Sequence, residues 1–112
     1  MSKINIEASI KKNNEKLEKT ITKAIIEDNR IKYIDNKVIT ILDIKNQKLK
    51  RITEEYDLII DFQNEKIITD YMDYQLDIDI KIIDKQIESN KIKIKYEIKD
   101  TKDTFEYKII WG

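Results

Sequence analysis

Apolar and polar residues alternate with a period of two in several segments of this 112-residue chain. Successive side chains of a β-strand point to opposite faces, so the alternation predicts strands with one apolar and one polar face. The pattern is clearest at residues 4–10, 76–82, 92–98 and 105–111. Because these segments are spread from one end of the chain to the other, they indicate an all-β protein.

Six further segments are expected to be extended, and short polar breaks separate them. They are Leu17–Ile26, Arg30–Ile34, Val38–Ile44, Leu49–Thr53, Asp57–Phe62 and Glu65–Met72. Asparagine and aspartate, which fill most of the breaks, tolerate positive φ angles and can replace glycine in tight turns. This spacing predicts an antiparallel up-and-down meander of about 8–10 strands that closes into a barrel, with residues 1–112 as one domain.

A helix is the alternative for residues 11–25, which contain good helix formers. A helix would have only a thin apolar stripe there, formed by Leu17, Ile21, Ala24 and Ile25. The β-branched residues Thr20 and Thr22 favour a strand, which is our prediction.

Composition excludes several functional classes. Lysine plus arginine and aspartate plus glutamate both number 22, so no net charge attracts nucleic acid or an anionic membrane. The absence of cysteine and histidine excludes disulfides, thiolate or imidazole catalysis and the usual zinc ligands. The only glycine is Gly112, so phosphate-cradling loops and nucleophile elbows are excluded too. Residues 1–7 lack the apolar core of a signal peptide, and we expect a cytoplasmic protein with no membrane partner.

Acidic side chains are densest at residues 70–79, where a metal site or a pair of catalytic carboxylates is conceivable. The candidates are Asp70, Asp73, Asp77 and Asp79. Isoleucines alternate with Asp77 and Asp79, which places both carboxylates on the solvent face of a strand. An EF-hand is excluded because Lys81 stands where a further ligand is needed and no glycine is present. We therefore expect no metal.

Serine is the remaining nucleophile, at Ser2, Ser9 and Ser89. No histidine is available as a base, and none of the three serines lies in a turn that indicates an exposed elbow. We assign no catalytic residue, and we expect neither enzymatic activity nor a cofactor.

Lysines cluster on two of the predicted strands. They are Lys91, Lys93 and Lys95 on one and Lys11, Lys12, Lys16, Lys19 and Lys23 on the other. With six tyrosines, they make an RNA- or ribosome-associated protein the alternative function. Zero net charge and only two arginines make nucleic acid an unfavoured partner.

Most of the aromatic residues fall on the apolar sides of their strands. The candidate lumen residues are Tyr33, Tyr71, Tyr74, Tyr96, Tyr107 and Trp111. In a closed barrel these rings face the lumen, where they either bind one small ligand or fill a packed core. We predict that Tyr74, Tyr96 and Tyr107 are buried and close to one another.

Five isoleucine doublets place one aliphatic side chain on each face of a strand. They are Ile25-Ile26, Ile59-Ile60, Ile67-Ile68, Ile82-Ile83 and Ile109-Ile110. Codon bias, a bulge or cover from a loop would explain them, and so would an outer apolar patch in a homodimer. We predict that the outer members are covered, by another copy or by this chain.

The order of the segments resembles a known family. A strand, an asparagine turn and a strand at residues 30–44 are followed by Tyr71–Ile80, Lys91–Ile98 and Phe105–Trp111. This arrangement resembles the YwiB-like family, small uncharacterised proteins of low-GC bacteria, and implies a calycin-like (lipocalin-type) β-barrel. The family has no established activity, so the resemblance implies no functional residues. The chain departs from the family in a shorter middle and in lacking its glycines.

The expected function is therefore a non-enzymatic barrel that binds a small apolar or amphipathic ligand or serves as an interaction module. We also predict that residues 74–83 and 91–98 form an antiparallel hairpin, because their connection is too short for a parallel crossover. The predicted register sets Asp79 opposite Lys93 and Ile80 opposite Ile92, so that opposite charges pair on one face and aliphatic side chains pair on the other.

Overall fold

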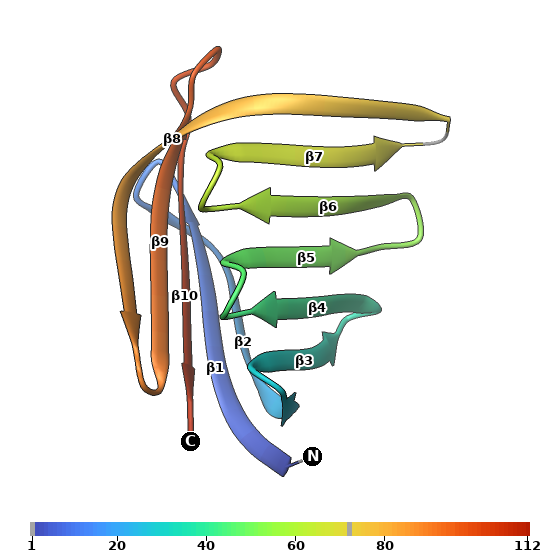
Figure 1. Cartoon of the computed structure of the whole chain (residues 1–112), viewed down its shortest axis with the longest axis vertical. Coiled ribbons are helices and arrows are strands. Elements are labelled where there is room, and N and C mark those ends of the chain that lie inside the picture. Colours follow the sequence, from blue (N-terminus) through green and yellow to red (C-terminus); the bar gives the residue numbers. More distant parts are fainter. Residues whose placement is uncertain (1, 72) are drawn as a thin grey trace.

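The computed structural model describes residues 2–71 and 73–112, and these form ten strands (Figure 1). The strands are β1 (Ser2–Lys12), β2 (Glu15–Glu27), β3 (Arg30–Asp35), β4 (Val38–Asp43), β5 (Lys48–Ile52), β6 (Tyr56–Asp61), β7 (Lys66–Tyr71), β8 (Tyr74–Glu88), β9 (Lys91–Ile98) and β10 (Thr104–Trp111). Each strand pairs antiparallel with the next, and β1 also pairs with β10, which closes the barrel. The predicted all-β meander is confirmed. No helix in the described ranges is long and apolar enough to cross a membrane.

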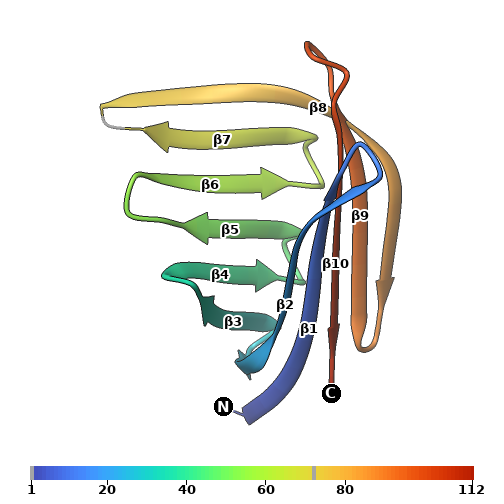
Figure 2. The same cartoon turned by 180° about the vertical axis from the view of Figure 1, so that it is seen from behind.

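The barrel wall runs in two directions (Figures 1 and 2). Strands β3 to β7 lie across the direction of β1, β9 and β10 in both views. The long strand β8 belongs to both parts of the wall, because residues 74–79 pair with β7 and residues 80–88 pair with β9. Strand β2 pairs with β1 along most of its length, which confirms the strand prediction over the helix.

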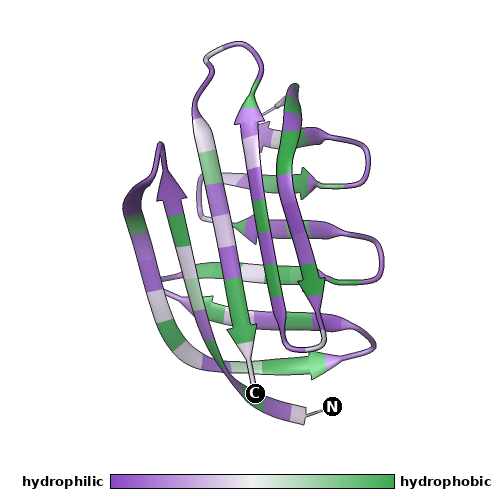
Figure 3. Cartoon of the chain, turned by 90° about the vertical axis from the view of Figure 1, so that its left-hand side faces the viewer, coloured by the Kyte–Doolittle hydropathy of each residue, from purple (hydrophilic) through white to green (hydrophobic). Residues whose placement is uncertain are grey.

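The core lies between the two parts of the wall and consists mainly of alternate aliphatic residues. Its fully buried large side chains are Ile6, Ile31, Leu42, Leu49, Ile60, Ile80, Ile92, Ile94 and Ile109. Figure 3 shows hydrophobic and hydrophilic residues alternating along the strands that face the viewer. Each such side chain contributes about 1.5–3 kcal/mol when it leaves water, so the alternation drives closure of the barrel.

Tight turns are built without glycine. Asn13 and Asn14 connect β1 to β2, and Asp28 and Asn29 connect β2 to β3, all four with φ between 49° and 68°. Two successive residues with positive φ are typical of type I′ turns, whose twist matches that of the flanking strands. The prediction that asparagine and aspartate replace glycine is confirmed at these two turns, whereas other turns have positive φ at Lys37, Gln47, Glu65 and Lys102.

The isoleucine doublets place one side chain inside and one outside. Ile60 is fully buried and Ile109 nearly so, whereas their neighbours Ile59 and Ile110 are partly exposed on the outer face. The outer member Ile83 is 49% exposed, so this chain does not cover it.

Strands β8 and β9 form the predicted antiparallel hairpin, but the register that we predicted for it is wrong. Ile80 pairs with Ile98 rather than with Ile92, a displacement of six residues along β9. Strand β8 continues to Glu88 instead of ending near residue 83, and the turn is only Ser89-Asn90. A bulge at Ile83 shifts the pairing, so that Lys85 and Ile87 lie opposite Ile94 and Ile92 and the polar run extends the strand where we had expected a loop.

Candidate functional site

Strands β2 and β3 pair over only a short distance. Their register runs from Glu27 opposite Arg30 to Ile25 opposite Lys32, three pairs in all. The residues of β2 that precede Ile25 pair with β1 alone, while β3 turns after Lys32 into the crossing part of the wall (Figure 1). The barrel wall therefore has an opening between these two strands.

A hollow of about 400 Å³ lies at this opening, and we call it the β2–β3 hollow. It is lined by Lys3, Lys23, Ala24, Ile25, Lys32, Tyr33 and Ile34. Ala24 and Tyr33 belong to the inner faces of their strands and are packed in or against the core. The hollow thus reaches residues of the inner strand faces, although Ala24 itself is buried in the core.

The charged residues that line the β2–β3 hollow are all positive. Lys3, Lys23 and Lys32 line it, and no carboxylate does. In the described part of the chain none of these lysines has a carboxylate within ion-pair distance. Ile34 beside them is 59% exposed. Free ammonium groups next to exposed aliphatic surface suit a ligand with one anionic and one apolar part.

A polar cluster lies behind Tyr33, inside the barrel. The Arg51 guanidinium contacts Glu18, with Nη2 3.2 Å from Oε1 and 3.4 Å from Oε2. Burial disfavours the charge on Arg51, but Tyr107 and Glu18 beside it outweigh burial and raise its pKa. Burial also raises the pKa of Tyr33, although a hydrogen bond with Thr40 opposes the shift. Arg51 therefore stays charged and already has partners within the chain.

One side-chain hydrogen bond joins β2 to β3 beyond their paired residues. Thr20 Oγ1 donates to Asp35 Oδ2 at 2.9 Å, and Thr20 is only 4% exposed. This bond connects the two strands where their backbones no longer pair, so the opening is bounded on that side.

The predicted lumen residues divide into three groups. Tyr96 and Trp111 are buried, and Tyr33 and Tyr107 pack against the core. Tyr74 is 71% exposed, so its predicted burial is wrong. It is the first residue of β8 and pairs with the last residue of β7, at the tip of a hairpin where no strand covers it. The side chain of Tyr71 lies outside the described residues.

Aromatic rings fill the interior around Tyr96. Its ring stacks on Phe105 with 5.6 Å between centroids and on Tyr107 with 6.3 Å. Burial raises the pKa of the Tyr96 phenol well above its ordinary value. The structure thus places these rings in a packed core rather than around an open lumen.

Of the residues that line the opening, sequence reasoning proposed Tyr33 as a candidate ligand-binding residue and missed the others. Lys23 was noted only as part of a basic run, and Lys3, Lys32 and Ala24 were not singled out. The small inward residue Ala24 gives no specific signal, because it is buried in the core and Ala8 is a similar inward residue that does not line the hollow. The lysines carry no local signal, since only the separation of β2 from β3 brings them together.

The other candidate groups are arranged as solvent-facing charges. Asp77 and Asp79 are exposed on the outer face, which confirms their predicted direction. Lys93 lies 3.6 Å from Asp84 and 3.4 Å from Glu106. Lys93 is the central residue of the predicted cluster Lys91, Lys93 and Lys95, and its charge is therefore largely neutralised. This disfavours the cluster as a phosphate-binding surface.

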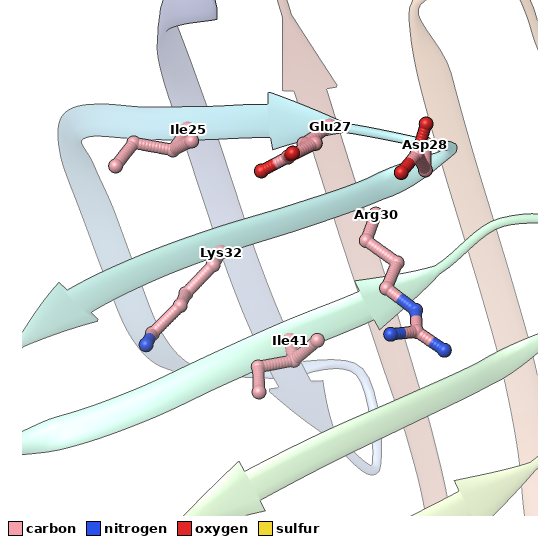
Figure 4. A pocket seen from close by; sticks show the side chains of 6 residues that line it. All are labelled: Ile25, Glu27, Asp28, Arg30, Lys32 and Ile41. Carbon is pink, nitrogen blue, oxygen red and sulfur yellow. The ribbon is translucent and has the colours of Figure 1, made fainter. Parts of the chain in front are cut away.

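A second hollow of about 410 Å³ lies beside the first on the outer surface (Figure 4). Its lining residues are Ile25, Glu27, Asp28, Arg30, Lys32 and Ile41. Both signs of charge occur here, and Arg30 Nε lies 3.6 Å from Asp43 Oδ2. This hollow therefore lacks the uniform charge of the β2–β3 hollow.

Comparison with family models, curated proteins and solved structures gives no significant match. The class of protein is therefore defined by the structure itself: a ten-strand antiparallel closed barrel with an opening between β2 and β3.

Proposed function

We propose that the protein is a non-enzymatic binding barrel that holds a small amphipathic anion in the β2–β3 hollow. The observation that carries this proposal is the combination of three lysines, no carboxylate and an apolar lining around one opening of about 400 Å³. That volume falls within the range of about 300–1,000 Å³ typical of small-molecule sites.

The expected binding mode follows from the position of each group. Lys3, Lys23 and Lys32 hold the anionic head at the outer rim, where each attraction is about 1 kcal/mol at 4 Å in water. The apolar tail lies against Ile34 and Ile25, and each buried CH₂ group contributes about 0.8 kcal/mol. The stacked rings around Tyr96 occupy the interior, so we place the ligand at the wall rather than in the centre of the barrel.

Titration calorimetry with decanoate and with uncharged decanol tests this proposal. We expect decanoate to bind more tightly than decanol, and the double variant Lys23→Glu/Lys32→Glu to weaken decanoate by about tenfold, which corresponds to 1.4 kcal/mol. The matched control is Lys45→Glu/Lys99→Glu, which changes the charge equally at two exposed turn residues and should bind normally. Ile34→Ala should weaken both probes, because it removes aliphatic contact surface.

Two results would overturn the proposal. One is decanoate and decanol binding equally to the unchanged protein, and the other is equal binding of decanoate to both charge variants. Retention of RNA that weakens steeply with salt would instead favour the alternative of an RNA- or ribosome-associated protein.

Kinship with the YwiB-like family and a cytoplasmic location also stand as proposals. The order of the strands and the closed ten-strand barrel support the kinship. A solved structure of a family member tests it. We expect the two structures to superpose strand for strand, and we expect the family member to share the bend in β8 and the opening between β2 and β3.

A further inference from the structure

The strand registers bring the three lysines of the β2–β3 hollow around a single residue, Ile25. Lys3 of β1 lies opposite Ile25 on one side, and Lys32 of β3 lies opposite it on the other. Neighbouring strands are about 4.8 Å apart, so the Cα atoms of these two lysines are roughly 10 Å from each other. Lys23 lies two residues before Ile25 on the same outer face, about 7 Å along β2. Three long exposed side chains therefore surround one aliphatic side chain.

The nearest carboxylates of this part of the wall lie on the other side of Ile25. Glu27 and Asp28 line the adjacent hollow, which shares Ile25 and Lys32 with the β2–β3 hollow. Figure 4 shows the Lys32 side chain directed away from both carboxylates. The flexible stem of lysine lets its ammonium group reach a ligand held above Ile25, which is 38% exposed.

The number of ammonium groups indicates how much negative charge the head of the ligand carries. A carboxylate neutralises only one of the three and leaves two like charges beside each other. A phosphate monoester carries about two negative charges at pH 7 and has three strong acceptor oxygens. One oxygen is then available to each ammonium group, and lysine is a common partner of phosphate in proteins.

Given the proposed function, on which this inference rests, we infer that the head group bound in the β2–β3 hollow is the dianion of a phosphate monoester. Its oxygens accept hydrogen bonds from Lys3, Lys23 and Lys32, and its apolar tail lies against Ile25 and Ile34. The class of ligand is therefore an alkyl phosphate. A carboxylate enters the same hollow but binds more weakly, because it leaves more of the positive charge unneutralised.

Titration calorimetry with decyl phosphate and decyl sulfate tests the inference, because these two tetrahedral head groups differ mainly in charge. The phosphate loses its second proton near pH 6, whereas a sulfate ester is a monoanion throughout. We expect decyl phosphate to bind at least about tenfold more tightly than decyl sulfate at about pH 7.5, and about equally at about pH 5.

The protein itself has no histidine, the side chain that ordinarily titrates in this range. The titratable and charged residues around the head group come from β1, β2, β3 and the turn between β2 and β3. They are Lys3, Lys23, Lys32 and Tyr33, with Glu27, Asp28 and Arg30 in the adjacent hollow. The change in preference with pH therefore reports the charge of the ligand.

The double variant Lys23→Gln/Lys32→Gln removes two of the three ammonium groups. We expect its preference for decyl phosphate over decyl sulfate to fall to less than about threefold at about pH 7.5. The matched control Lys45→Gln/Lys99→Gln removes the same charge at two exposed turn residues and should keep the full preference. Because the preference is a ratio of two affinities measured on one preparation, a fraction of unfolded protein does not alter it.

Two further probes separate the possible sources of the phosphate. Inorganic phosphate has no tail, and we expect it to bind at least about a hundredfold more weakly than decyl phosphate. Vesicles of phosphatidylcholine that contain phosphatidic acid present a phosphate monoester at a membrane surface. Vesicle binding that the double variant loses would support the inference with a lipid headgroup as the source. Binding of free decyl phosphate without vesicle binding would support it with a soluble ligand.

Failure of this inference and failure of the proposed function give different results. If decanoate and decyl sulfate bind but decyl phosphate binds no more tightly at about pH 7.5, the head-group assignment is wrong and the proposed function stands. If none of the three binds, the proposed function fails and the inference with it. Inorganic phosphate that binds as tightly as decyl phosphate would also overturn the inference, because the tail would then contribute nothing.

Discussion

Arg51 shows how a single buried charge is held in this barrel. Its guanidinium contacts Glu18, and Tyr107 beside it adds a further favourable interaction, so its raised pKa keeps the charge despite burial. Breaking such a pair from one side leaves an uncompensated charge, which costs more than the intact pair contributes. We therefore interpret Arg51 as a structural residue that joins β5 to β2 across the interior, and we assign the charge of the proposed ligand to the lysines at the rim.

Asp61 makes stability depend on pH. Its carboxylate accepts hydrogen bonds from the backbone N–H groups of Gln63 and Asn64 and from Asn64 Nδ2, at 2.9–3.0 Å. Burial raises its pKa, but these hydrogen bonds outweigh burial and lower it. Because the folded-state pKa lies below the unfolded value of about 3.9, the stabilisation is complete above that pH and is lost as pH falls through the folded pKa.

Urea unfolding of Asp61→Asn as a function of pH checks this. We expect a loss of about 1 kcal/mol at pH 7 that shrinks as the pH falls below the unfolded-state pKa of about 3.9. Asp77→Asn, whose carboxylate is exposed, is the control and should change little at either pH. A deficit for Asp61→Asn that stays constant from pH 7 to pH 2 would contradict the assigned hydrogen-bonding role.

At the scale of elements, the strands were predictable and their bends were not. Ten strands follow from alternation and polar breaks, because burial of one face depends on local sequence. The bend of β8 does not follow, since Asp84-Lys85-Gln86 interrupts the alternation in the way that a loop would. A bulge at Ile83 resolves the conflict only when β9 supplies the partner strand.

Turn geometry gives a test at the same scale. Lys37 has a φ of 66° without being glycine, asparagine or aspartate. Left-handed backbone costs an ordinary residue about 1–2 kcal/mol, so Lys37→Gly should raise the free energy of unfolding by roughly 1 kcal/mol. Urea unfolding is the measurement. Lys45→Gly, in a turn position that does not have positive φ, should be neutral or destabilising, and equal effects of the two substitutions would show the strain to be absent.

At the scale of the whole molecule, the candidate site arises from barrel closure. Lys3, Lys23 and Lys32 come from three strands, and none belongs to a motif in the sequence. Where the wall changes direction, β2 remains paired with β1 but no longer pairs with β3. The opening lies where this pairing ends. Tyrosine positions were predicted from alternation, and that rule failed at Tyr74 because alternation gives a face but not its cover.

The central claim is that ligand binds at the opening and not in the centre of the barrel. The most direct measurement is a titration of ¹⁵N-labelled protein with decanoate, followed through the backbone amide shifts. We predict progressive shifts at Lys23, Ala24 and Ile34, and nearly constant positions for Tyr96 and Trp111. Shifts concentrated at Tyr96 and Trp111, or no saturable shifts at all, would contradict the account.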